Sequence, residues 1–413
     1  MFKIKNENNM ITQRSRGYLI FLTVFLGLIA QLDQYLNLVE TTISTNIINE
    51  YGISLGEFMF WQGIYGIITL AVFFVNWSMD AIGRKGGLII LVLLMGVPSL
   101  LIPLIGFNFH VFMILYALVI MGTLSNAWEI PISEEAPPKS RGLYGGLVFL
   151  IGLIPLYALL GEDIAVALGW RWCYGIMVIL MVVILVLMIF FKEPKRWHQS
   201  KLKRGDSRFK ILKSIKSLKK RDVIYILVSS LVYGIWNISF KLATTSAKVY
   251  FVEALGYTAD QYQLFITIGG LMTLVAAFIS GFFMDKLGRN KVLIIGCVGA
   301  TVSYCLMGIT EWPIFLILVY FFMPVVLAWI LVYFAEIFPT DVRGTCIGLL
   351  NIGSRISYIA GPLLGWTLLD ILLLPYLTYY AIAGLLMLVP LLALLTRPYE
   401  TKCKTLEEIE QER

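Results

Sequence analysis

Ionisable residues inside long apolar stretches are the first feature of this sequence that could do chemistry. Asp33 lies in "GLIAQLDQYLNL" (27–38), with apolar runs on both sides. An ionised side chain at the centre of a bilayer costs about 2.5–3.5 kcal/mol on insertion scales, so such a residue normally faces a cavity and has a function. Burial away from water disfavours the charged form of a carboxyl group. We therefore predict that Asp33 is the proton carrier, the alternative being a permanent pair with a Lys or Arg.

Basic residues in other apolar stretches are expected to complement this carboxylate. Arg355 lies twelve residues beyond Arg343, which is about 18 Å along a helix. Its planar fork suits a carboxylate and keeps its proton, so it needs an anionic substrate or an acidic neighbour. A fixed pair with Asp33 or with backbone groups is the alternative. Lys241 is expected to contact the substrate or Asp33, or to lie at the membrane interface, and Lys248 to snorkel into the outer interface.

Two other acidic residues, Glu40 and Glu129, lie nearer to the ends of predicted helices and are not assigned to the site. The five cysteines and two histidines show no metal-binding or redox spacing, so no metal site and no disulfide framework are expected. No arrangement of a nucleophile and a base is visible either. An enzyme is therefore not expected.

The elements that must position these residues are membrane-spanning helices. Of the 413 residues, 59% are hydrophobic and 14% charged, and the mean hydropathy is +0.81. Apolar runs long enough to cross a bilayer recur along the chain, and only helices suit such spans. The expected fold class is an all-α membrane protein with twelve transmembrane helices. The predicted spans are 17–47, 56–79, 86–106, 109–132, 142–161, 171–191, 222–252, 258–284, 291–310, 312–334, 344–368 and 373–395.

Lysine and arginine in the short loops predict the orientation of these spans. The loops 83–87, 137–142, 285–291 and 339–344 are basic and lie on the side of both termini, whereas the opposite loops are acidic. The positive-inside rule places the basic side in the cytoplasm. We expect a multi-pass plasma-membrane protein with both termini cytoplasmic. The N-terminal segment 1–16 is expected to be retained as a cytoplasmic tail, because the apolar run behind it is too long for a signal peptide.

A strongly basic segment divides the chain. Residues 192–221 contain 13 Lys and Arg against Glu193 and Asp206. Its amphipathic part is predicted to contact anionic lipid, and a solvated linker that sets orientation is the alternative. The expected domains are an N-terminal six-helix half (17–191), this basic loop, a C-terminal six-helix half (222–395) and a cytoplasmic tail (396–413).

An internal repeat relates the two halves. "MDAIGRK" (79–85) returns as "MDKLGRN" (284–290), and "EEAPPKSRG" (134–142) returns as "EIFPTDVRG" (336–344), at shifts between 202 and 205 residues. Duplicated halves with a site between them are typical of secondary transporters. Charge-assisted bonds between these loops would bias the inward–outward equilibrium, and loop rigidity is the alternative reading. The predicted gating residues are Asp80, Gly83, Arg84, Glu134, Arg141, Asp285, Gly288, Arg289, Glu336 and Arg343.

The same repeat predicts a shared cavity. A shift of 204 residues aligns Asn237 with Asp33 and Lys241 with Asn37. Asn237 and Lys241 lie one turn apart and so share a helix face. We expect the spans 17–47 and 222–252 to present Asp33, Asn37, Asn237 and Lys241 to one cavity. The predicted substrate-binding residues are Arg355, Lys241, Asn237, Asn37, Gln34, Trp236, Asn126, Asn351 and Tyr358, and further candidates for the cavity wall are Gln31, Trp128, Tyr233 and Trp329.

Over residues 17–410 these motifs resemble the major facilitator superfamily. "DAIGRK" and "DKLGRN" are similar to its repeated loop signature, and "EPKRW" and "RPYETKCKTLEEI" to sugar-porter landmarks. The stretch 335–365 looks more like transporters of aromatic acids, niacin and other organic acids. The sequence departs from both branches in lacking an Arg in span 109–132, and Leu36 replaces a second Asp. The resemblance implies the major facilitator fold and alternating access.

The combined prediction is a secondary active transporter that takes up a small organic anion, a monocarboxylate or an aromatic acid, together with a proton. Arg355 and Lys241 would hold the carboxylate while Asp33 carries the proton. A proton-coupled or facilitative sugar porter is the main alternative, and an exporter of amphiphilic compounds is the third. We expect no cofactor other than protons as coupling ion, no nucleic-acid partner, and a monomer.

Overall fold

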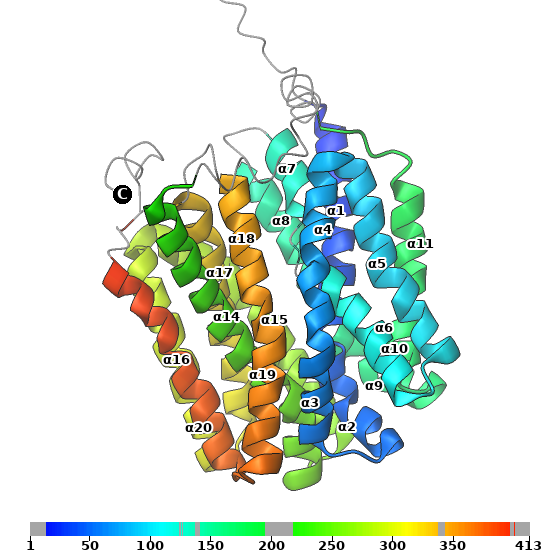
Figure 1. Cartoon of the computed structure of the whole chain (residues 1–413), viewed down its shortest axis with the longest axis vertical. Coiled ribbons are helices and arrows are strands. Elements are labelled where there is room, and N and C mark those ends of the chain that lie inside the picture. Colours follow the sequence, from blue (N-terminus) through cyan, green and yellow to red (C-terminus); the bar gives the residue numbers. More distant parts are fainter. Residues whose placement is uncertain are drawn as a thin grey trace, which may run out of the picture.

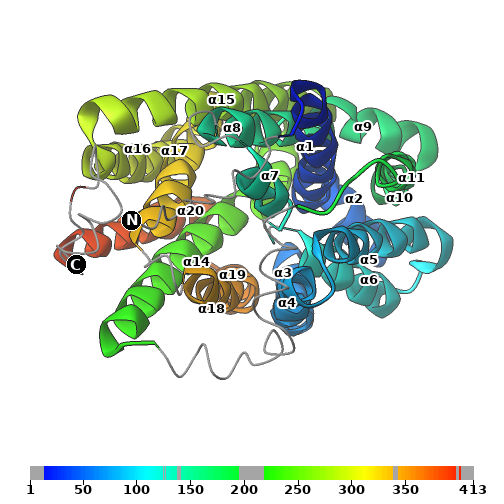
Figure 2. The same ribbon diagram turned by 90° about the horizontal axis from the view of Figure 1, so that it is seen from above.

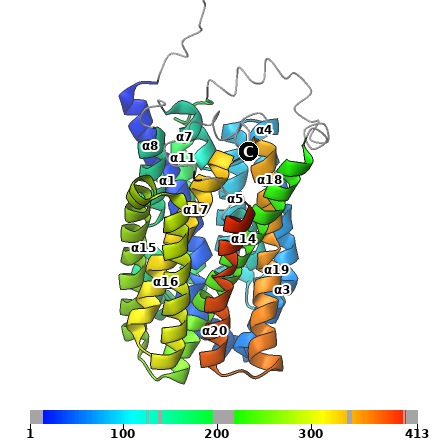
Figure 3. The same cartoon turned by 90° about the vertical axis from the view of Figure 1, so that its left-hand side faces the viewer.

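The computed structural model describes residues 14–123, 125, 127–136, 141–194, 218–337, 343–396 and 400, and the regular structure in these ranges is helical. Figures 1 and 3 show the helices running side by side along the long axis of the molecule. In Figure 1 the helices labelled α4, α5, α6, α10 and α11 lie on the right, and α14, α16, α17, α18 and α20 lie on the left.

The helices up to residue 191 form the N-terminal half. They are α1 (Arg16–Leu38), α2 (Glu40–Tyr51), α3 (Leu55–Gly66), η1 (Ile67–Ala71), α4 (Val72–Ala81), α5 (Arg84–Ile105), α6 (Phe109–Gly122), α7 (Glu129–Glu135), α8 (Arg141–Gly152), α9 (Leu156–Leu168), α10 (Trp172–Gly175) and α11 (Met177–Leu187).

The helices from residue 220 onward form the C-terminal half. They are α14 (Lys220–Lys248), η3 (Val249–Ala254), α15 (Ala259–Leu287), α16 (Arg289–Thr310), α17 (Pro313–Ile337), α18 (Arg343–Arg355), α19 (Ser357–Trp366), η4 (Thr367–Ile371), α20 (Tyr376–Leu386) and η5 (Val389–Thr396). Seen from above, α14 and α18–α19 lie between the rest of this half and α3–α4 (Figure 2).

The predicted spans fall on these helices. Within the described residues, nine helices are long and apolar enough to cross a membrane, and Phe109–Gly122 and Trp172–Leu187 are shorter apolar helices. The predicted span 344–368 corresponds to α18 and α19. The fold class is therefore an all-α membrane protein, as the sequence predicts.

Two predicted spans differ in their detail. The span predicted at 109–132 is not one helix: α6 ends at Gly122 and α7 begins at Glu129. The intervening sequence contains Thr, Ser and Asn, whose side chains compete for backbone hydrogen bonds and favour breaks. The span predicted at 142–161 is divided before α9, because Pro155 has no backbone N–H to continue the helix. Helix α9 then extends to Leu168, beyond the predicted end.

The two halves meet most closely where α3 packs on α19. A Cβ atom at Gly63 would lie 2.6 Å from the Leu363 Cγ atom and 3.0 Å from the Ile359 carbonyl oxygen, so only glycine allows this approach. Ser54, the N-cap of α3, also contacts the Asp370 carboxylate across the halves at 2.5 Å. These contacts lie toward the end of the molecule that carries the acidic loops, which we call the acidic end (the lower end in Figure 1).

Candidate functional site

A cavity of about 740 Å³ lies between the two halves and contains most of the residues predicted to bind substrate. Gln34 and Asn37 come from α1, and Trp236, Asn237 and Lys241 come from α14. Tyr358 of α19 also lines it. The remaining wall is largely apolar and aromatic, with Phe149, Leu153, Tyr157, Phe240, Tyr320 and Leu327 among its members. A mostly apolar cavity with a few polar groups is typical of a small-molecule site.

Three other predicted substrate residues are not part of this wall. Asn351 and Arg355 do not line the cavity, and Asn126 lies outside the described residues. Of the residues that the repeat aligns, Asn37, Asn237 and Lys241 line the cavity and Asp33 does not.

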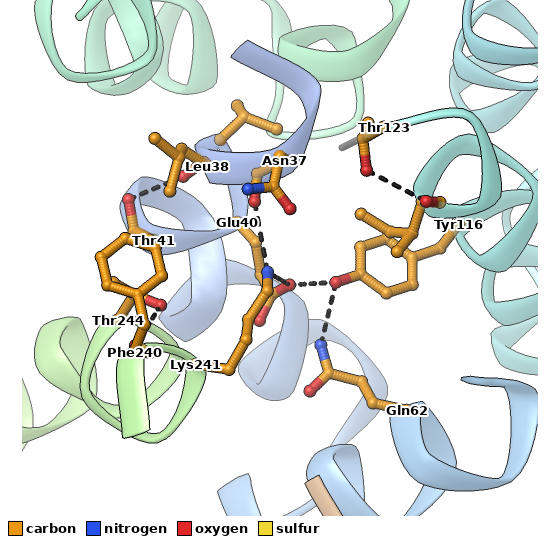
Figure 4. A network of polar contacts seen from close by, with 12 residues as sticks. Asn37, Leu38, Glu40, Thr41, Gln62, Tyr116, Thr123, Phe240, Lys241 and Thr244 are labelled. Carbon is orange, nitrogen blue, oxygen red and sulfur yellow. Dashed lines mark hydrogen bonds and ion pairs between the residues drawn. The ribbon is translucent and has the colours of Figure 1, made fainter. Parts of the chain in front are cut away.

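The ammonium group of Lys241 contacts the junction between α1 and α2. Helix α1 ends at Leu38, and α2 begins at Glu40 after a single turn residue. The Lys241 Nζ atom donates to the Asn37 carbonyl oxygen at 3.2 Å and lies 3.8 Å from the Glu40 carboxylate (Figure 4). Lys241 therefore lines the cavity, as the sequence predicts, but its ammonium group contacts the α1–α2 junction rather than Asp33.

Glu40 is a buried member of the site that sequence reasoning missed. Its side chain is about 1% exposed, and its Oε2 atom accepts a hydrogen bond from the Tyr116 hydroxyl of α6. The Gln62 amide of α3 donates to that hydroxyl at 3.2 Å (Figure 4). The signal was available: Glu40 follows Asp33 by seven residues, two helical turns, and so lies on the same face. Because Glu40 lies near the end of a predicted helix, it is not assigned from the sequence to the same site as Asp33.

Asp33 is fully buried, and it is hydrogen-bonded to a residue of its own half. Its Oδ2 atom accepts a hydrogen bond from the Trp128 indole at 3.1 Å. Trp128 is itself fully buried and directly precedes α7. The basic residues that the sequence offers as partners, Lys241 and Arg355, bond elsewhere. The lining of the main cavity does not include Asp33.

Arg355 caps the C-terminal end of α6, a helix of the opposite half. Its guanidinium donates to the Ile120 carbonyl oxygen at 3.1 Å and to that of Thr123, at the C-terminus of α6. The group also lies 5.0 Å from the centre of the Tyr358 ring. A cation at a helix C-terminus is favoured by the helix dipole and by unpaired carbonyls. These contacts agree with the alternative that Arg355 pairs with backbone groups rather than with a substrate.

The predicted gating residues at the opposite end, which we call the basic end, form a capping arrangement in each half. In the N-terminal half, Arg84 pairs with Glu134 at 2.6 Å, and Glu193 accepts from the Arg84 and Lys85 backbone N–H groups. Gly83, which precedes them, has a φ of 115° that favours glycine.

The C-terminal half repeats this cap. Glu400 accepts from the backbone N–H groups of Arg289 and Asn290, and Gly288 has a φ of 101°. The Arg289 guanidinium donates to the Met284 carbonyl oxygen at 2.8 Å. The remaining gating predictions concern side chains outside the described ones: Asp80, Arg141, Asp285, Glu336 and Arg343.

At the acidic end, Lys248 forms a buried ion pair, so the prediction that it snorkels to the interface is wrong. Its side chain is about 2% exposed and lies 2.7 Å from the Glu162 carboxylate of α9. The ammonium also donates to the Thr42 carbonyl oxygen and to Asn46 of α2. Two turns separate Lys248 from Lys241 on α14, so both lysines bind the α1–α2 segment across the interface between the halves.

A helical bundle of two halves with a cavity between them is the architecture of a secondary transporter. The family model of the Major Facilitator Superfamily matches residues 23–258 and 238–411, so the chain belongs to that family. The glucose transporter GlcP of Staphylococcus epidermidis is 26% identical over 391 residues, covering 81% of this chain and 83% of that protein. The cis,cis-muconate transport protein of Acinetobacter baylyi is 25% identical over 373 residues, covering 84% and 86%.

Solved structures show the same fold. The inward open form of the xylose transporter XylE from E. coli has a TM-score of 0.71 at 19% identity, covering 95% of this chain and 99% of that chain. The resemblance to the major facilitator superfamily is thus confirmed, and the protein is a multi-pass membrane transporter rather than an enzyme. Its relatives include both sugar and organic-acid carriers.

Proposed function

We propose that this transporter takes up a small organic anion, a monocarboxylate or an aromatic acid, together with a proton. The observation that carries the proposal is the charge of the cavity wall. Among the described residues that line it, Lys241 is the only Lys, Arg, Asp or Glu. A wall with one cation and no carboxylate favours a substrate with one negative charge.

The other side chains of the cavity suit the rest of such a molecule. The amide N–H groups of Gln34, Asn37 and Asn237 can donate to carboxylate or hydroxyl oxygens. Asn37 Oδ1 is buried without a hydrogen-bond partner among the described residues and can accept from a hydroxyl group. The rings of Trp236 and Tyr358 offer flat apolar surface for an aromatic or aliphatic body. Arg355 remains a predicted substrate residue from the sequence, but the proposal assigns the carboxylate to Lys241.

Asp33 is proposed as the proton carrier that drives accumulation, and the orientation of the chain assigns each end of the molecule to a compartment. The basic end would lie in the cytoplasm by the positive-inside rule. Cross-half bonds such as Lys248–Glu162 and Ser54–Asp370 would then close the outer end. We propose that the gating residues of the basic end bias the equilibrium between the inward-open and outward-open states. We also propose that the protein acts as a monomer in the plasma membrane and that the segment 192–221 contacts anionic lipid.

A sugar porter is the second candidate, because amides and an indole in one cavity also suit hydroxyl groups. Uptake of radiolabelled benzoate, pyruvate and D-glucose into proteoliposomes with an acidic exterior separates the two. We expect uptake of the acids, and loss of at least tenfold in Lys241→Gln. Glucose uptake that survives Lys241→Gln, without acid uptake by the wild type, would show that the protein is a sugar porter.

A further inference from the structure

We propose that Glu40 is the protonation site that controls Lys241. In its ionised form Glu40 holds the Lys241 ammonium, and in its protonated form it releases that ammonium to the carboxylate of the substrate. The inference rests on the proposed function, because it needs an anionic substrate at Lys241. It adds a second carboxyl group to the proposed mechanism, one that Asp33 does not replace.

The geometry around Glu40 supports a switch between two partners. Oε2 accepts from the Tyr116 hydroxyl and lies 3.8 Å from the Lys241 Nζ atom, too far for a direct hydrogen bond. Oε1 is buried and has no hydrogen-bond partner among the described residues. A buried carboxylate with one oxygen unsatisfied is costly, and a proton on Oε1 removes its charge. Oε1 is therefore the atom at which we place the proton.

Among the described residues, the ion pair of Glu40 is with Lys241, and its other titratable neighbours are tyrosines. Helix α14 contributes Lys241, and α6 contributes Tyr116. Tyr174 of α10 and Tyr358 of α19 lie within electrostatic reach of the carboxylate. The three tyrosines are neutral at physiological pH. Protonation of Glu40 thus changes the balance of charge around Lys241 directly.

Lys241 connects this carboxyl group to the substrate cavity. It lines the main cavity and also a second one of about 380 Å³, which Gln62 and Tyr116 line as well. Figure 4 shows Lys241 and Tyr116 directed toward Glu40, and Gln62 directed toward the Tyr116 hydroxyl. The second cavity reaches the Glu40 partners Lys241 and Tyr116, and the main cavity reaches Lys241 from the proposed substrate side. One proton then enters with one carboxylate, and the site gains no net charge.

The test compares the pH dependence of benzoate binding in wild type and Glu40→Gln, using purified full-length protein in detergent. In the wild type, the affinity should fall as the pH rises, by at most about tenfold per pH unit for one linked proton. In Glu40→Gln, the neutral amide cannot hold Lys241 by charge. Its affinity should stay constant and exceed that of the wild type at least tenfold at the alkaline end. A wild-type pH profile in Glu40→Gln would overturn the inference.

Control variants define the source of the effect. Glu57→Gln removes an exposed carboxylate of α3 and should keep the wild-type profile. Tyr116→Phe removes the donor that stabilises the Glu40 carboxylate, so the loss of affinity should move to higher pH. Calorimetry in buffers of different ionisation enthalpy should count one proton fewer per benzoate in Glu40→Gln. An unchanged proton count would contradict the proposal even if the affinity changed.

A second readout separates this inference from the proposed function. The acidified, substrate-free wild type should show one carboxyl infrared band that acidified Glu40→Gln lacks, beyond the bands that Asp33 and the other carboxyl groups give in both proteins. Its absence from the wild type would refute the switch whatever the substrate is. Conversely, if the wild type takes up D-glucose and neither acid, the proposed function fails first. If benzoate is taken up and Glu40→Gln titrates like the wild type, only the role of Glu40 fails.

Discussion

At the scale of single residues, two buried carboxylates stand in different surroundings. Asp33 accepts from the Trp128 indole, whereas Glu40 accepts from Tyr116 and faces Lys241. A charge pair at the distance of Glu40 and Lys241 is worth about 4 kcal/mol at an effective dielectric constant of 20. Neutralising Glu40 therefore changes the availability of Lys241 strongly. Asp33 does not line the main cavity, so its proposed role as proton carrier is separate from the control of Lys241.

Asp33→Asn tests the role of the other carboxyl group. The amide keeps the size of the side chain and its hydrogen bond from Trp128, so the variant should still exchange labelled for unlabelled benzoate in counterflow. Accumulation driven by a pH gradient should fall, because the proton carried at this position is lost and only the one bound at Glu40 remains. Proteoliposomes assayed at two external pH values measure both properties. If the variant still concentrates benzoate as the wild type does, Asp33 is not the proton carrier.

At the scale of helices, interruptions decide where charged side chains bind. The junction of α1 and α2 offers the carbonyl oxygens of Asn37 and Thr42 to the two lysines of α14. The end of α6 offers those of Ile120 and Thr123 to Arg355. In both places a cation of the C-terminal half caps broken helical backbone of the N-terminal half. Such contacts can form and separate as the halves move, which suits alternating access.

Arg355→Ala tests whether this arginine caps a helix or binds substrate. Hydrogen bonds from charged donors are worth about 1.5–3 kcal/mol each, so loss of the cap should slow turnover at least tenfold. The Kd for benzoate should change less than threefold. Arg355→Lys, which keeps the charge and one donor group, should recover part of the turnover. A tenfold rise in Kd with unchanged turnover would instead support the substrate role that the sequence predicts.

At the scale of the whole molecule, the sequence predicts more of the fold than of the site. Apolar runs and the 204-residue repeat place the helices and bring Asn37, Asn237 and Lys241 to one cavity. The ion pair of Lys248 and the backbone contacts of Arg355 are not predictable in this way. Each depends on which groups of the other half lie within reach, and a hydropathy pattern carries no such information.

The ion pair between Lys248 and Glu162 offers the sharpest test of how the two halves move. Both side chains are largely buried, with 2% and 12% of their area exposed. Removing one partner of a buried pair typically costs about 3–5 kcal/mol. Glu162→Gln should therefore shift the equilibrium at least tenfold toward a state that is open at the acidic end. Spin labels at Leu168→Cys and Ile371→Cys, both exposed at that end on different halves, would report longer distances.

A matched control variant shows whether the effect comes from the ion pair between the two halves or from the loss of one acidic charge. Glu50 pairs with Arg171 at the same 2.7 Å distance, also at the acidic end, but both residues belong to the N-terminal half. Glu50→Gln should leave the label distances unchanged, because this pair does not join the halves. If Glu162→Gln behaves like Glu50→Gln, the pair stabilises helix packing only. If both variants open the acidic end, the effect comes from the acidic charge of that end and not from the bond between α9 and α14.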